Sequence, residues 1–430
     1  MSIRPYINLL AGVWLLFSSC RFEHGSSIII NNDNDNLSVR YEGQIHFNED
    51  ETEVQSISSD GYLKFIRNGE ELDAKNDPSG HLQIEITQGG RKLNPNDEEG
   101  KKVEADAVKE LIEIGFDAKE RMERIYKKGG APALMEQEGL LKMDYVKAMY
   151  FKFLLSQDSL PVNIQRNIAR KIGSDMGSDN DRGRLLQQFP ENYLRDTMVI
   201  RNWFESLQQM GSDYDKANAM LSLLHNSNSM MDPIAEVCDV VHGMGSDYEK
   251  SRIIRDCINM PGGALSELDF DKLLESIGEM GSDYEKANLI RALIGAQKQS
   301  AAHFNKLLDI SVHINNDYDR VNLIKELVDA GLPADADFGR LISAVVHTNS
   351  DYDRGELIRD LTAKNMRSNE QWIEIIEAAA TLSSDEDKCN LLVTMAPVLP
   401  KTDSVRSVYM KTAKTINQEF ELGRAMKALE

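Results

Sequence analysis

A stripe of polar side chains recurs along the second half of the chain and could bind an extended peptide. Each row combines a tyrosine with residues four and seven positions later, within about 60° of one another on a helix. The rows are Tyr248, Arg252 and Arg255; Tyr284, Asn288 and Arg291; Tyr318, Asn322 and Lys325; and Tyr352, Glu356 and Arg359. Rows about 10 Å apart would form a ladder of amide and guanidinium donors, matching about three peptide residues per step. The alternative is that each tyrosine packs on the neighbouring repeat while asparagine and arginine satisfy loop carbonyls.

Some residues of the same segments suggest metal binding. Asp213 and Asp215 have the spacing of calcium ligands, but a calcium loop also needs a glycine at its sixth position and a glutamate at its twelfth. His313 and His347 share one repeat position, yet a full repeat is too far for a metal with bonds of about 2 Å. We therefore expect no metal site and interpret these residues as helix caps and helix-end histidines.

The remaining reactive or aromatic residues occupy apolar repeat positions. Cys238, Cys257 and Cys389 replace apolar residues of sister repeats, which predicts buried free thiols, with a Cys238–Cys257 bridge as the alternative. Trp203 and Trp372 are expected in the core. We find no glycine-rich phosphate loop and no nucleophile elbow in the sequence. The residues therefore predict no enzyme activity and no cofactor.

An internal repeat positions all of these residues. The motif Gly/Asn-Ser-Asp-Tyr-Asp/Glu-Lys/Arg and its variants recur with aspartates 34 to 36 residues apart, at Asp179, Asp213, Asp247, Asp283, Asp317, Asp351 and Asp385. A degenerate copy precedes them at Asp144 and a half copy follows from Asn417. This period is typical of two-helix units that stack into an α-solenoid. It predicts about eight 34-residue repeats over residues 142–430.

One repeat, from Gly281 to Ile314, shows how its sequence defines two helices. Ser282 and Glu285 have the form of a capping box, in which two side chains satisfy two backbone donors at a helix start. Apolar residues at helical spacing follow. In four copies the preceding helix ends in Met-Gly, as at Gly281, which predicts a left-handed glycine cap.

The chain ahead of the repeats has a different pattern. Apolar and polar residues alternate over residues 38–90, with a tight-turn signal at Asp60-Gly61, which predicts a small antiparallel domain of four or five strands over residues 37–97. Residues 101–141 are expected to be a helical cap of the solenoid. The predicted fold class is therefore α+β, mainly α.

The first 20 residues have the features of a secretory signal peptide. An early positive charge, an apolar run from Ile7 to Phe17 and Ser18-Ser19-Cys20 predict signal peptide residues 1–19 and a lipid on Cys20, with ordinary secretion as the alternative. Residues 20–36, rich in Asn, Asp, Ser and Gly, are expected to form a lipidated tether.

Composition restricts the partners. The chain has 430 residues, with 70 acidic and 49 basic ones and a formal net charge of −21, which argues against a nucleic-acid partner. Four cysteines are too few for a disulfide scaffold.

The strand segment from Tyr41 to Asn68, the segments at Gly115-Phe116-Asp117-Ala118-Lys119 and Asp144-Tyr145-Val146-Lys147-Ala148, and the repeats resemble a family of bacterial envelope modules. These modules join a short β-domain to Ser-Asp-Tyr-Glu-Lys helical repeats, either standalone or attached to membrane metallopeptidases of the β-lactam-sensor type. This chain lacks the His-Glu-x-x-His of such peptidases.

The resemblance and the repeats together imply a non-catalytic, lipid-anchored protein of the bacterial cell envelope, held to the membrane through its lipid alone. Its solenoid would serve as a scaffold or sensor that binds a protein or peptide. The alternative is an envelope enzyme or enzyme inhibitor with its site at the junction of the β-domain and the solenoid.

Overall fold

The computed structural model describes residues 26–32, 35–226, 234–260, 265–296, 300–364 and 368–429. The expected signal peptide and Cys20 lie outside these residues. The chain divides into two compact units. The N-terminal unit runs to Ile168 and includes Asp175–Asp181, and the solenoid unit comprises Ala169–Ser174 and the chain from Arg182.

The N-terminal unit begins with a β-domain whose main sheet is antiparallel, in the order β1-β2-β5-β6-β7-β8. A separate hairpin pairs β3 with β4. The strands are β1 Ser26–Asn32, β2 Asp35–Glu42, β3 Ile45–Phe47, β4 Val54–Ile57, β5 Tyr62–Arg67, β6 Glu70–Asn76, β7 Leu82–Gln88 and β8 Arg91–Leu93. Val39, Phe65, Leu72 and Ile86 face one another across successive strands and are fully buried, as alternating patterns require.

The β-domain differs from the sequence expectation in three respects. Its described strands exceed four or five. The two strands on either side of the Asp60-Gly61 turn do not pair with each other. Among the described strands, β4 pairs with β3, whereas β5 pairs with β2 and β6, so this turn joins the β3–β4 hairpin to the main sheet. Residues 26–32, expected to be part of a tether, pair with β2 as a strand, which suits their run of three isoleucines.

The helices follow the predicted repeat closely. They are α1 Glu98–Glu113, α2 Ala118–Glu138, α3 Asp144–Leu155, α4 Val162–Ser174, α5 Asp179–Gln187, α6 Thr197–Gln208, α7 Asp213–Asn226, α8 Ile234–His242, α9 Asp247–Ile258, α10 Glu267–Gly278, α11 Asp283–Ala296, α12 Ala301–Val312, α13 Asp317–Ala330, α14 Phe338–Val346, α15 Asp351–Ala363, α16 Asn369–Ala380, α17 Asp385–Met395, α18 Asp403–Ala413 and α19 Glu419–Ala428. Short 3-10 turns lie at Tyr193–Arg195 and Ala396–Val398. The predicted mainly α fold class is confirmed.

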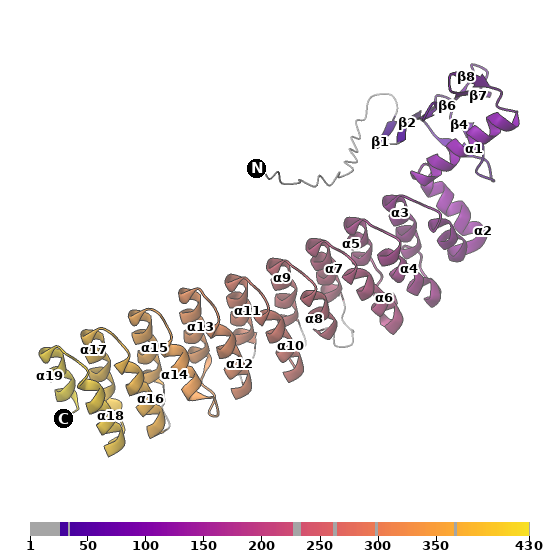
Figure 1. Ribbon diagram of the computed structural model, residues 1–430. Coiled ribbons are helices and arrows are strands. Elements are labelled where there is room, and N and C mark those ends of the chain that lie inside the picture. Colours follow the sequence, from indigo (N-terminus) through magenta and orange to yellow (C-terminus); the bar gives the residue numbers. More distant parts are fainter. Residues whose placement is uncertain are drawn as a thin grey trace, which may run out of the picture. The chain divides into compact units, whose positions relative to one another are not determined.

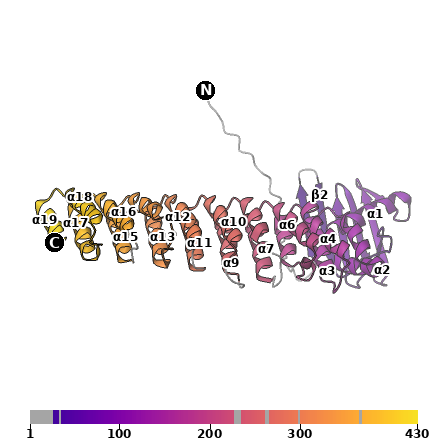
Figure 2. The same ribbon diagram turned by 90° about the horizontal axis from the view of Figure 1, so that it is seen from below.

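The solenoid unit is a two-layered stack (Figure 1). Odd-numbered helices from α7 to α19 contact one another in sequence, and even-numbered helices from α6 to α18 form the second layer (Figure 2). Ile290 and Leu293 of α11 and Phe304 and Leu307 of α12 are fully buried between the layers. Each helix pair thus buries its apolar face against its neighbours, as a solenoid requires.

The corners between repeats differ from the expected glycine caps. Gly177, Gly245 and Gly281 do not have positive φ angles. Each lies beside an aspartate oxygen of the preceding repeat instead, at 3.4–3.6 Å from where a Cβ would stand. In later repeats Asn315, Asn349, Ser383 and Asn417 occupy this position. These corners therefore share a carboxylate close to the backbone. They do not share a left-handed backbone conformation.

Candidate functional site

The first aspartate of each repeated motif links its own repeat to the next one. Asp247, at the start of α9, accepts hydrogen bonds from the backbone N–H groups of Gly281 (2.8 Å) and Ser282 (2.7 Å) at the start of α11. Asp144, Asp213, Asp283 and Asp385 accept the same pair of hydrogen bonds. Asp317 and Asp351 each accept the first of the two, from the backbone N–H groups of Asn349 and Ser383. The aspartate therefore has a structural role.

This contact corrects half of the predicted capping box. Ser282 caps α11 as expected, since its hydroxyl accepts a 3.3 Å hydrogen bond from the backbone N–H of Glu285. The backbone N–H of Ser282 itself binds Asp247 and not Glu285. Burial alone would raise the pKa of the equivalent Asp351, but hydrogen bonds from Ser383 lower it on balance.

The basic residue at the sixth position of the motif is structural as well. Arg354 donates to the carbonyl oxygens of Thr348 (2.6 Å) and Thr381 (3.0 Å), which belong to the corners on either side of its repeat. Lys147 donates to the carbonyl oxygen of Asp175 at 2.6 Å. These contacts satisfy carbonyl groups that helix ends leave without partners.

The basic members of the predicted stripe are largely neutralised within the solenoid. Arg291 contacts Glu326 (3.0 Å) and Asp319 (3.4 Å), and Lys325 contacts Asp360 (3.3 Å), in each case one repeat further on. The hydrogen bond to Asp360 raises the pKa of Lys325. These side chains are therefore not free donors for a peptide.

Most of the other stripe residues also have partners within the solenoid. Arg252 bonds to Glu249 and to Asn218 of the preceding repeat, Arg255 lies 4.0 Å from Glu285, and Arg359 pairs with Glu356. Asn288 accepts a 3.4 Å hydrogen bond from Arg291, and Asn322 is half-buried. Most of these groups therefore have side-chain partners within the solenoid, and not the loop carbonyls that the alternative interpretation expects.

The tyrosines behave differently from every other position of the motif. Tyr214, Tyr248, Tyr284, Tyr318 and Tyr352 are 62, 62, 66, 76 and 73% exposed, so they do not pack on neighbouring repeats. Among the described residues their hydroxyls form no hydrogen bond and their rings form no aromatic pair. We call these five residues the tyrosine edge. Tyr214 was missed by the sequence analysis, although it continues the repeat.

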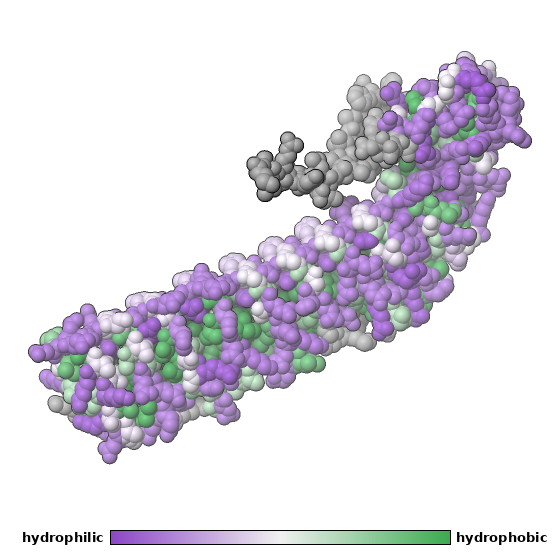
Figure 3. Space-filling view, in the orientation of Figure 1, coloured by the Kyte–Doolittle hydropathy of each residue, from purple (hydrophilic) through white to green (hydrophobic). Residues whose placement is uncertain are grey.

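The tyrosine edge follows the starts of consecutive helices in one layer. The aspartate contacts hold the starts of α7, α9, α11, α13 and α15 beside one another. Pale, near-neutral patches recur along the edge of the solenoid in the space-filling view (Figure 3). In the first copy the tyrosine differs, because the Tyr145 hydroxyl donates to the Ile114 carbonyl and burial raises its pKa to about 12.

Other predicted residues have unremarkable surroundings. His313 and His347 cap helix ends, with Nδ1 at 2.6 Å from the Asp309 carbonyl and 2.7 Å from the Ser343 carbonyl. Cys257 is buried, and burial raises its thiol pKa to about 12. Cys238, Cys257 and Cys389 are free thiols as expected, and Cys257 and Cys389 are buried, but Cys238 is only half-buried. Trp203 and Trp372 are buried as expected.

The N-terminal unit contains a second candidate site, a hollow of about 230 Å³. It lies between the β-domain and the link from α1 to α2, and is lined by residues of both: Tyr41, Gly43, Gln44, Ile45, His46, Ile114, Gly115, Phe116, Asp117 and Glu120. Burial, together with Glu120, raises the pKa of Asp117 to about 6. The alternative site expected from the sequence, at the junction of the β-domain and the solenoid, does not include Asp117, and no sequence pattern singles this residue out as part of a site.

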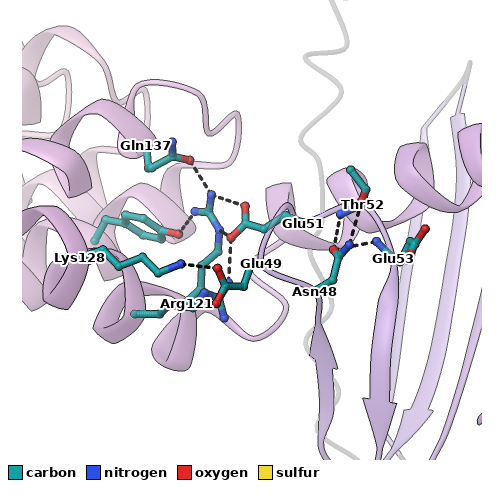
Figure 4. A network of polar contacts seen from close by, with 10 residues as sticks. Asn48, Glu49, Glu51, Thr52, Glu53, Arg121, Lys128 and Gln137 are labelled. Carbon is teal, nitrogen blue, oxygen red and sulfur yellow. Dashed lines mark hydrogen bonds and ion pairs between the residues drawn. The ribbon is translucent and has the colours of Figure 1, made fainter.

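An ion-pair network holds the β3–β4 turn against α2 beside this hollow (Figure 4). Arg121 is buried and donates two hydrogen bonds of 2.8 Å to the carboxylate of Glu51 in the turn. It also contacts Gln137 (2.6 Å) and the hydroxyl of Tyr150. Arg124 adds a 2.9 Å contact to Glu51. The β3–β4 turn is therefore tied to α2 by buried and half-buried ion pairs.

Three further findings bear on function. In the part of the chain that the structure describes, every helix is too short or too polar to span a bilayer. Within the same residues, no three His, Cys, Asp or Glu side chains gather closely enough to hold a metal ion. No protein-family model matches the chain, and no curated protein matches it significantly.

Proposed function

We propose that this protein is a non-catalytic bacterial cell-envelope lipoprotein whose solenoid binds a protein or peptide partner along the tyrosine edge. One observation carries the proposal. In the repeated Asp-Tyr-Asp/Glu-Lys/Arg segment the first aspartate binds the next corner, and the second acid and the basic residue have partners within the solenoid in several repeats. The tyrosine is left exposed in five consecutive repeats. Tyrosine presents a large, rigid contact area that ends in a hydrogen-bonding group, which suits it to interfaces.

Charge favours a basic partner. The chain has a formal net charge of −21, and carboxylates already neutralise most of the cations that flank the tyrosine edge. A partner with lysine or arginine beside its contact residues would be drawn to this surface and would be released by added salt. A nucleic acid would be repelled.

Site-specific photocrosslinking in intact cells tests this function. A benzophenone amino acid replaces Tyr284 or Tyr318 in one set of cells, and exposed Glu275 on α10, in the other layer, in a control set. We expect one discrete adduct from the tyrosine positions that disappears when the remaining edge tyrosines are changed to alanine. The same adducts from Glu275, or no adduct from either position, would contradict the proposal.

The lipid anchor forms part of the same proposal. A diacylated Cys20 would hold the protein at a membrane surface by burying hydrocarbon, with the folded units in water. Changing Cys20 to Ser should move the protein from the membrane fraction to the soluble envelope fraction. Protease shaving of whole cells then identifies which side of the outer membrane carries it.

An envelope enzyme or enzyme inhibitor is the second candidate, and the hollow of the N-terminal unit favours it. A carboxyl with a pKa of about 6 beside a second carboxyl is suited to proton transfer near neutral pH. Cleavage of envelope peptides or polysaccharides that is lost in Asp117→Asn but retained in Tyr284→Ala would support this candidate over the scaffold.

A further inference from the structure

The hollow of the N-terminal unit carries two carboxylates and no lysine or arginine among its described lining residues. Asp117 and Glu120 project from the start of α2, and His46 and Gln44 belong to the β-domain side. The guanidinium of Arg124 acts on Asp117 electrostatically but is itself bound to Glu51 at 2.9 Å. The charge of the hollow at neutral pH is therefore negative.

Asp117 does not perform the usual task of its position. It is the N-cap residue of α2, where an aspartate normally accepts a hydrogen bond from the backbone two or three residues later, yet its side chain makes no such bond. Its Oδ2 is buried without a hydrogen-bond partner in the described structure. The carboxylate torsion of aspartate is soft, so either oxygen can turn towards a ligand in the hollow.

The backbone at Asp117 is also held in an unusual conformation. Its φ of 53° is left-handed, which costs a residue other than glycine about 1 kcal/mol or more. The neighbouring Phe116 is fixed by an edge-on contact with Tyr41, at 4.6 Å between ring centroids. These two rings form an aromatic wall of the same hollow.

We propose that this hollow binds a primary alkylammonium group, either a lysine side chain on a peptide or a small free amine. The ammonium group would satisfy Asp117 and Glu120, and its methylene chain would lie against Tyr41 and Phe116. An ammonium group has three N–H donors and no acceptor, which suits a site whose two carboxylates are both acceptors. The faces of aromatic rings also attract cations. A volume of about 230 Å³ leaves room for roughly five to seven non-hydrogen atoms.

Other ligand classes fit less well. An anion would meet two carboxylates and no cation in the described lining. A neutral apolar group would leave Asp117 Oδ2 without a partner, which is costly for a buried charge. A metal ion usually needs more oxygen or nitrogen ligands than the hollow brings together, since the described residues contain no cluster of three.

This inference goes beyond the tyrosine edge and gives a ligand chemistry to the site of the second candidate. The experiment measures binding of the amine and not turnover. A hollow that binds the amine but catalyses no reaction is therefore distinguished from a hollow that binds no amine, so failure of the enzyme candidate and failure of this inference give different results. The probes are n-butylamine, the neutral isostere n-butanol, and Nα-acetyl-lysine methylamide, each titrated by NMR into the full chain at pH 7.5. Shifts in residues that line the hollow report binding.

We expect n-butylamine to bind and n-butanol to bind at least about tenfold more weakly, because one charge-assisted hydrogen bond is lost. Binding of the lysine amide as well identifies a lysine side chain as the source, and binding of n-butylamine alone identifies a small free amine. Asp117→Asn should weaken either amine about tenfold or more. Asparagine is nearly isosteric and tolerates left-handed backbone, so the variant should fold.

Asp106→Asn is the matched control, since it removes one exposed carboxylate of α1 that does not line the hollow. The alkylammonium ion stays charged at pH 5, so affinity should fall between pH 7 and 5 as Asp117 takes up a proton. Glu120, His46 and Arg124 also act electrostatically on the carboxyl of Asp117. Equal binding of amine and alcohol, or undiminished binding by Asp117→Asn with a normal fold, overturns the proposal.

Discussion

The carboxylate of Asp247 accepts a 2.7 Å hydrogen bond from the backbone N–H of Ser282, which caps the next helix of the same layer 35 residues later. This contact joins the starts of consecutive repeats. Because each repeat of a solenoid touches only its neighbours, a contact of this kind acts on one interface at a time.

Replacing Asp247 with alanine should therefore weaken one interface. Two hydrogen bonds from Gly281 and Ser282 to a charged acceptor are lost, and we expect a cost of about 2 kcal/mol. Hydrogen exchange should rise in α9 and α11 and not in α17. Asp239→Ala, which removes an exposed carboxylate of α8, is the control and should cost under about 0.5 kcal/mol. Equal losses in both variants would contradict this prediction.

Arg354 should be replaceable by lysine only at a cost. Its guanidinium bridges the carbonyls of Thr348 and Thr381, and one ammonium group cannot match this planar fork. We expect Arg354→Lys to lower the free energy of unfolding by about 1 kcal/mol and Arg354→Met by more. Urea titration of both variants measures the difference, and equal stability of lysine and arginine would argue against a bridging role.

The tyrosine edge should contribute little to stability. Tyr318 is 76% exposed, so we expect Tyr318→Ala to change the free energy of unfolding by less than about 0.5 kcal/mol. Leu323, fully buried on the same helix, is the comparison, and Leu323→Ala should cost about 3 kcal/mol. A large loss from Tyr318→Ala would mean that the tyrosines hold repeats together and are not kept for a partner.

Arg121 should be the residue that ties the β3–β4 turn to the helices. Its replacement by methionine leaves Glu51 with only Arg124, and we expect a loss of about 3 kcal/mol. Double-mutant cycles with Glu51→Gln measure the coupling of the pair, which should exceed about 1 kcal/mol. Independent effects of the two substitutions would contradict the network.

Asp117 should make the N-terminal unit more stable as the pH falls from 7 to 5. Its folded pKa of about 6 lies above the reference value of 3.8, so between these values the folded state binds a proton that the unfolded state does not. This stability is fully present below the unfolded pKa and is lost as the pH rises through the folded pKa of about 6. Because the carboxyl is only partly buried, solvent screening reduces the gain between pH 7 and 5 to under about 1 kcal/mol. The difference between wild type and Asp117→Asn, measured by hydrogen exchange of α2 against pH, isolates the contribution. A difference that does not change with pH would contradict the raised pKa.

Much of this architecture was predictable because its signals are local. A serine three residues before an acidic one marks the start of α11, apolar spacing marks its buried face, and a 34-residue period marks the stack. Trp203 was recognisable as core for the same reason. Caps and apolar faces depend on neighbours within a few turns, and the period is visible as recurring letters, so the order of residues specifies all three directly.

Tertiary structure alone decided which atoms meet across repeats. Asp247 and Glu285 both look like helix-start acids in sequence, yet one binds the next corner while the other lies near Arg255. The exposure of Tyr284 and the unsatisfied oxygen of Asp117 likewise depend on how units pack and not on local pattern. Helical periodicity sets the direction of a side chain, but its partner is supplied by chain about 34 residues away, and that position is known only once the repeats are stacked.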